Sequence, residues 1–161
     1  MSTETNIAVI RRLIDEGFSA GDLAVVDELV DPDSISHQRG QKPGVEGVRD
    51  TIRTLHASFS EFHLEIVDLV ADGDTVWIRN RATGINTGSV MGRPPTGKAM
   101  DITVIDIVRF ADGRIVEHWG VPDQLGMLMQ IGLFGRPEPA TDATDATRTT
   151  VPASATAASA A

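Results

Sequence analysis

The feature that most constrains the fold is a change of hydrophobic period near residue 60. Before this point, apolar residues recur at helical spacing and predict helices over residues 4–19, 23–30 and 44–59. After it, apolar and polar residues alternate, which predicts strands over residues 62–70, 76–83, 100–110 and 115–121. A short apolar helix is expected over residues 124–131. Helices first and an antiparallel sheet afterwards indicate an α+β fold.

The length of 161 residues fits one domain with a real core, which we expect to span residues 1–135. Residues 136–161 are rich in Ala, Thr, Ser and Pro and cannot offset the entropy cost of ordering, so a disordered tail is expected. The net charge of −9 argues against a nucleic-acid partner. No long apolar run or leader segment is visible, so we expect no membrane partner and a cytoplasmic location.

The hairpin around Asp112-Gly113 allows a strand register to be predicted. Asp-Gly is typical of a two-residue turn between two strands. Such a turn pairs Phe110 with Ile115 and, further from the turn, Asp106 with Trp119. The register decides which side chains share a face.

This register places Asp106, Trp119 and Asp123 on the more apolar face of the strand pair and turns His118 to the other face. An apolar wall raises the pKa of a carboxyl group and makes the carboxylate a better base. We therefore expect the face that carries Asp106 to line a pocket. A one-residue bulge in the link at residues 120–122 would reverse the facing of the residues beside it.

The helices-first layout, the segment GRPPTGK at residues 92–98 and the segment EHW at residues 117–119 together resemble the SnoaL-like polyketide cyclase or ester cyclase family, over residues 5–134. The resemblance implies an NTF2-like fold, a cone-shaped half-barrel in which three N-terminal helices pack on a curved antiparallel sheet. It also implies an apolar pocket for a hydrophobic small-molecule substrate, and homodimers packed through the outer sheet face. Cyclases of this family close a polyketide ring in natural-product biosynthesis by an intramolecular aldol reaction.

The resemblance implies that one aspartate is the general acid/base and that no metal or cofactor takes part. Asp123 best matches this aspartate. The alternative is that Asp123 only caps the helix that follows, and both roles are compatible. The four histidines lack the spacing of a zinc site, so no metal is expected. Relatives of this fold include hydroxylases, isomerases, epoxide hydrolases and non-catalytic binders, so the fold alone does not decide the function.

Further candidates surround this strand pair. His37 follows the second helix on a polar segment, where it is either a donor or proton carrier at the mouth of the cone or a solvated loop histidine. His118 is a catalytic candidate if a bulge turns it inward. Arg79 and Arg81 are expected to point outward, which argues against the aspartate–arginine–aspartate set of epoxide hydrolases. The candidate substrate-binding residues are Trp119, Asp106 (or Asp106 as a buried group bonded to Trp119 or Asn80), Asn80, Phe59 and Met91.

Overall fold

The structure is a computed structural model, and it describes residues 2–135. The predicted disordered tail at residues 136–161 lies outside the described residues. None of the helices among residues 2–135 combines the length and the hydrophobicity that a membrane span requires.

The helices form where the helical period predicted them. Ser2 caps the first helix by accepting a hydrogen bond from the backbone N–H of Thr5 at 3.3 Å. The third helix begins at Gly44, whose φ of +72° suits glycine and whose missing side chain leaves room for the carbonyl oxygen of Pro32. The helical elements are α1 (Thr3–Arg12), which continues as the π-helical turn η1 (Leu13–Ser19), α2 (Ala24–Leu29), α3 (Gly44–Ser58) and α4 (Gln124–Gln130).

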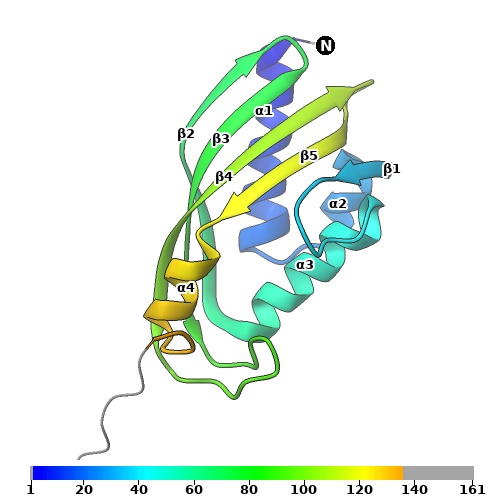
Figure 1. Cartoon of the computed structure of the whole chain (residues 1–161). Coiled ribbons are helices and arrows are strands. Elements are labelled where there is room, and N and C mark those ends of the chain that lie inside the picture. Colours follow the sequence, from blue (N-terminus) through cyan, green and yellow to red (C-terminus); the bar gives the residue numbers. More distant parts are fainter. Residues whose placement is uncertain (1, 136–161) are drawn as a thin grey trace, which may run out of the picture.

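Five strands form one curved sheet in the order β1-β5-β4-β3-β2 (Figure 1). Its antiparallel part was predicted, but the sheet is mixed, because β1 runs parallel to β5. The sequence suggested the end of a helix and a polar segment where β1 lies. This strand sits at the sheet edge, where Pro32 is tolerated, and its pairing partner is some 80 residues away in the chain. The strands are β1 (Val30–Ser36), β2 (Phe59–Asp72), β3 (Thr75–Asn86), β4 (Ala99–Ala111) and β5 (Arg114–Pro122).

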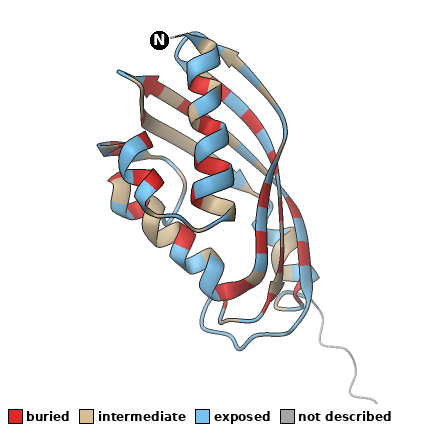
Figure 2. Ribbon diagram, turned by 180° about the vertical axis from the view of Figure 1, so that it is seen from behind, coloured by how far each residue is buried: buried red, intermediate tan, exposed pale blue. Residues whose placement is uncertain are grey.

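The helices α1 and α3 cover the concave face of the sheet and leave the other face bare (Figures 1 and 2). Along β3, Val76, Ile78 and Asn80 are buried under the helices. Arg79 and Arg81 alternate with them on the bare face, as predicted, where they pair with Asp68 and Asp101 respectively. The core therefore lies between the helices and one face of the sheet.

The predicted register of the β4–β5 hairpin is right at the turn and wrong beyond it. Asp112 and Gly113 form the two-residue turn with positive φ angles, and Phe110 pairs with Ile115. The next pair is Arg109 with Glu117, so residue 116 is an extra residue, a β-bulge. A bulge was foreseen only near residues 120–122, whereas it lies directly after the turn.

This bulge reverses the facing of every later residue of β5. His118 now pairs with Val108 and Gly120 with Asp106, so His118 shares the concave face with Asp106. Trp119 pairs with Ile107 on the bare face, contrary to the predicted register. The pocket-facing residue of the segment at 117–119 is thus the histidine, not the tryptophan.

Candidate active site

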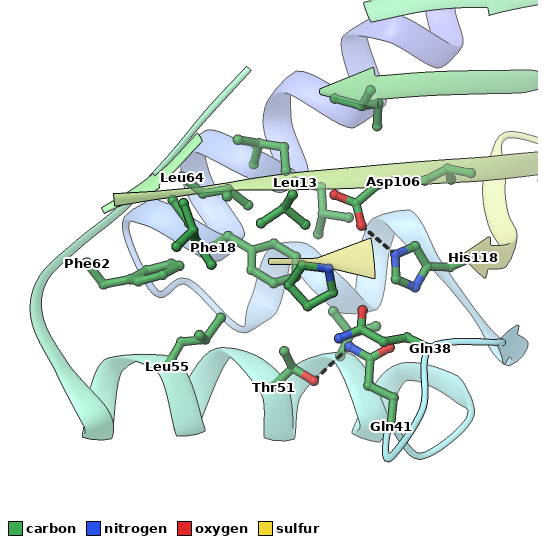
Figure 3. Close-up of a pocket in the computed structure, with 18 of the residues that line it drawn as sticks. Leu13, Phe18, Gln38, Gln41, Thr51, Leu55, Phe62, Leu64, Asp106 and His118 are labelled. Atoms are coloured by element: carbon green, nitrogen blue, oxygen red, sulfur yellow. Dashed lines mark hydrogen bonds and ion pairs between the residues drawn. The ribbon is translucent and has the colours of Figure 1, made fainter. Parts of the chain in front are cut away.

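A cavity of about 280 Å³ lies between the helices and the concave face of the sheet. Its wall is mainly apolar, and Figure 3 shows Leu13, Phe18 and Leu64 on one side and Leu55 of α3 on the other (Figure 3). Apolar lining of this kind suits a hydrophobic small molecule. The other apolar lining residues include Ile10, Ile14, Val48, Phe62, Ile78, Ile102, Val108, Ile115 and Met127.

Two ionisable side chains of the sheet meet in this apolar wall. The Nε2 atom of His118 on β5 lies 2.9 Å from Oδ1 of Asp106 on β4 (Figure 3). Their side chains are 24% and 14% exposed, so they are largely enclosed but reachable from the cavity. A carboxylate and an imidazole in direct contact can take up, share and return a proton.

Asn80 binds the second carboxyl oxygen of Asp106. Its Nδ2 atom donates to Oδ2 of Asp106 at 2.8 Å, and the residue is fully buried behind the cavity wall. The two predicted roles of Asp106, a pocket carboxylate and a group bonded to Asn80, therefore hold together. Asn80 itself is not a lining residue, so the structure places it as a support for Asp106.

Gly120 provides the space that this arrangement needs. A Cβ atom at this position would lie 2.2 Å from Oε1 of Gln38, 2.8 Å from Cε1 of His118 and 3.0 Å from Oδ1 of Asp106. These separations are shorter than van der Waals contact, so a side chain here would displace the pair. Sequence reasoning did not identify Gly120, because its role depends on the strand register.

The wall opposite the sheet carries further polar groups that the sequence analysis missed. Gln38 and Gln41 follow β1, and Thr51 lies on α3 (Figure 3). Ser36 at the end of β1 lies next to His118 in the parallel pairing. The polar composition of residues 34–41 was visible in the sequence, but it drew attention to His37.

His37 lies with Trp119, away from the cavity lining. The two rings are stacked with centroids 4.7 Å apart, and His37 Nε2 is 2.8 Å from Oε1 of Glu117. Arg109 Nε donates to Oε2 of the same carboxylate at 2.7 Å. The hydrogen bond with His37, followed by that with Arg109, lowers the pKa of Glu117 below its ordinary value. The expectation that Trp119 lines the pocket is wrong, because the bulge turns it to the bare face.

Asp123 caps α4 and does not line the cavity. Its Oδ1 atom accepts a hydrogen bond from the backbone N–H of Gly126 at 2.8 Å, which is the capping role weighed from the sequence. The expectation that it lies on the pocket face is wrong for the same reason as for Trp119. Phe59 is buried in the core, and Met91 is 74% exposed on the loop before β4, so neither lines the cavity.

Comparisons with known proteins found a matching family and several relatives. A family model described as SnoaL-like polyketide cyclase matches residues 8–131. Aklanonic acid methyl ester cyclase DauD of Streptomyces sp. (strain C5) is 30% identical, over 78% of this chain and 81% of DauD. The solved structure of IdmH from Streptomyces antibioticus is 36% identical with a TM-score of 0.68, over 78% of this chain and 96% of IdmH. That of TsrD from Streptomyces laurentii is 25% identical with a TM-score of 0.77, over 83% of this chain and 99% of TsrD.

Proposed function

The chain belongs to the SnoaL-like polyketide cyclase family, and we propose that it is an enzyme of natural-product biosynthesis that closes a ring in a hydrophobic polyketide. The reaction is an intramolecular aldol addition. The observation that carries the proposal is the contact between Asp106 and His118 in the wall of an apolar cavity. The name of DauD, aklanonic acid methyl ester cyclase, supports ring closure as the reaction.

In this mechanism Asp106 is the general base. Its carboxylate removes a proton from a carbon that lies between two carbonyl groups of the bound polyketide, which leaves an enolate. The enolate carbon attacks a second carbonyl carbon of the same molecule, so that one carbon–carbon bond forms and an alkoxide results. The alkoxide then takes a proton back from the Asp106–His118 pair, and no net proton is gained or lost.

The cavity contributes orientation and the exclusion of water. Binding in an apolar pocket holds the flexible polyketide with its two reacting carbons close together. The entropy of the polyketide is then lost on binding and not in the reaction step, which lowers the barrier. The cavity of about 280 Å³ is near the lower end of the size range of ligand pockets, roughly 300–1,000 Å³. This size supports a small-molecule substrate.

The neighbours of Asp106 weigh against the epoxide hydrolase alternative. The groups that contact its carboxyl oxygens are the amide of Asn80 and the imidazole of His118. Arg79 and Arg81 point to the bare face and are engaged by Asp68 and Asp101. A hydroxylase and a non-catalytic binder remain as outcomes of the experiment below.

The test compares Asp106→Asn with Asp123→Asn, using aklanonic acid methyl ester as the probe substrate. Asp106→Asn keeps the size of the side chain but removes the base, so turnover should fall by about 10²–10⁴-fold. Asp123→Asn keeps the helix cap and should leave turnover within about twofold of the wild type, because asparagine caps as well as aspartate. Product formation is followed by liquid chromatography and mass spectrometry, and thermal unfolding checks that both variants fold.

Each other outcome has a defined meaning. Wild-type turnover in Asp106→Asn, or its loss in Asp123→Asn, would refute the assignment of the base. Tight binding of the probe by the wild type without any product would favour the non-catalytic binder. Oxygen consumption with product formation would favour the hydroxylase.

A homodimer through the bare sheet face is also part of the proposal. Val70, Trp77, Ile107 and Trp119 are paired in turn across β2, β3, β4 and β5, so they form an apolar row across four strands of that face. Trp77 is 50% exposed and Val70 is 62% exposed. Ile107 and Trp119 are partly buried, so the exposed part of the row is centred on Val70 and Trp77. An exposed apolar patch of this kind supports association with a second copy. The cytoplasmic location inferred from the sequence stays a prediction.

A further inference from the structure

A line of hydrogen bonds runs from the backbone of α3 to the side chain of His118. It passes from the carbonyl group of Gly47 through Thr51, Gln41 and Ser36. A backbone carbonyl oxygen can only accept a hydrogen bond. The direction of every bond in the line can therefore be deduced from this end.

The first two bonds fix the orientation of the Gln41 amide. Thr51 Oγ1 lies 2.9 Å from the oxygen of Gly47, so the single hydroxyl hydrogen of Thr51 is used there. Thr51 Oγ1 can then only accept from Gln41, whose nitrogen Nε2 lies 3.0 Å away. This leaves the amide oxygen of Gln41 facing Ser36.

The next bond fixes the hydroxyl of Ser36. Its Oγ lies 2.5 Å from Oε1 of Gln41, which can only accept, so Ser36 donates its single hydrogen to Gln41. Ser36 Oγ is then an acceptor on its remaining side. That side receives the backbone N–H of Gln38 at 3.4 Å and faces Nδ1 of His118 at 3.5 Å. A favourable contact at Nδ1 therefore requires a hydrogen on that nitrogen.

We propose that Ser36, Gln41 and Thr51 are positioning residues that hold a hydrogen on Nδ1 of His118 and so select its tautomer. Nδ1 then stays a donor, and Nε2 is the only ring nitrogen that gains or loses a proton. Nε2 faces Asp106 Oδ1 at 2.9 Å, so a single proton is shared at this contact. The tautomer itself is independent of the reaction, whereas its effect on turnover rests on the proposed function.

The tautomer of His118 with its hydrogen on Nδ1 favours the aldol reaction. With the hydrogen held at Nδ1, a second proton at Nε2 makes the ring a cation beside Asp106, and this charge stabilises the enolate that forms when Asp106 takes a proton from carbon. With the hydrogen at Nε2 alone, the ring would be neutral and its Nδ1 lone pair would face the lone pairs of Ser36. In serine proteases, holding the catalytic histidine in the wrong tautomer strongly reduces kcat.

The test uses long-range ¹H–¹⁵N correlation spectra of the full chain together with kinetics. His118→Gln assigns the His118 ring signals. In the wild type, Nδ1 of His118 should carry a hydrogen. Thr51→Val keeps the shape of the side chain but removes its hydroxyl. The orientations of the Gln41 amide and the Ser36 hydroxyl are then no longer fixed, and the His118 signals should shift toward a mixture of tautomers.

The kinetic arm measures kcat and KM for aklanonic acid methyl ester across a range of pH. Thr51→Val should lower kcat by roughly tenfold, the effect of losing about one net hydrogen bond, with KM nearly unchanged and the pH profile of kcat displaced. Thr51→Ser keeps the hydroxyl and should restore both the spectrum and kcat. Thr54→Val, an exposed position of the same helix α3, is the matched control and should change neither.

The two arms separate the failure of this inference from the failure of the proposed function. An unprotonated Nδ1 in the wild type, or a His118 spectrum that does not respond to Thr51→Val, overturns the inference whatever the turnover. A responsive spectrum in a protein that turns over no polyketide supports the tautomer and refutes the function. A loss of kcat in Thr51→Val that Thr51→Ser does not restore would also overturn the inference.

Discussion

Gly120 lies across the β4–β5 ladder from Asp106, and at this position a hydrogen atom is all that fits. Its φ is not positive, so backbone conformation does not require glycine here. What requires it is proximity, since Gln38, His118 and Asp106 all approach the place where a Cβ would stand. The functional pair is thus positioned partly by the absence of a neighbouring side chain.

Gly120→Ala should damage activity more than stability. The added methyl group meets the ends of side chains that can move, so the free energy of unfolding should fall by no more than about 1–3 kcal/mol. The same movement displaces Asp106 and His118 by a fraction of an ångström to an ångström, which should lower turnover by roughly 10²-fold. Denaturant unfolding and single-turnover kinetics measure the two effects. Wild-type turnover in Gly120→Ala would contradict the tight approach described here.

Among the elements, helix α4 is stabilised by contacts with residues outside the helix. A helix of seven residues is too short to be stable in isolation. Asp123 caps its first turn, and the side chain of Gln130 bonds both the N–H and the C=O of Asp101 on β4, at 2.7 Å and 2.9 Å. These bonds hold α4 against the sheet, where Met127 reaches the cavity.

Asp123→Ala should therefore be a stability variant. Loss of the cap is expected to lower the free energy of unfolding by about 1 kcal/mol, within a general range of roughly 0.5–2 kcal/mol. Asp123→Asn should lose much less, because its side-chain oxygen can accept the same bond from Gly126. Urea unfolding of the two variants side by side makes the comparison. Equal losses in both would show that the negative charge, and not the cap, is what matters at this position.

At the scale of the whole molecule, the sheet has one face covered by helices and one face bare (Figures 1 and 2). The bare face carries ion pairs such as Arg81 with Asp101, together with the apolar row that includes Trp77. An antiparallel sheet usually presents polar side chains to water on such a face. The apolar row is therefore the surface feature that indicates an interface with a partner.

Trp77→Lys should convert the proposed dimer into a monomer. A lysine in the middle of the row would bury an unpaired charge in the interface, which is strongly unfavourable. Met91→Lys is the control, because Met91 is an exposed apolar residue on the loop before β4 and outside the row. Light scattering coupled to size-exclusion chromatography reports the mass. A wild-type monomer, or a dimer that persists in Trp77→Lys, would refute this interface.

The order and kind of most elements follow from the residue pattern along the chain. Helical spacing up to residue 59 and alternation beyond it predicted α1, α3 and the strands β2 to β5 with errors of a few residues at the ends. It also predicted the turn at residues 112–113 and the outward facing of the arginines on β3. These features follow from local periodicity and local turn chemistry, which the order of residues carries directly.

Which residues form the site depends on how the strands pair in three dimensions. Ile115 and Val116 are both apolar, so nothing in the local pattern shows that one of them is an extra residue in the ladder. A single inserted residue exchanges the two faces of everything that follows, and this exchange brings His118 to Asp106 and leaves Asp123 to cap α4. The parallel pairing of β1 with β5, which brings Ser36 beside His118, likewise joins segments far apart in the chain. A register is a relation between two strands, and for that reason neither strand's own sequence contains it.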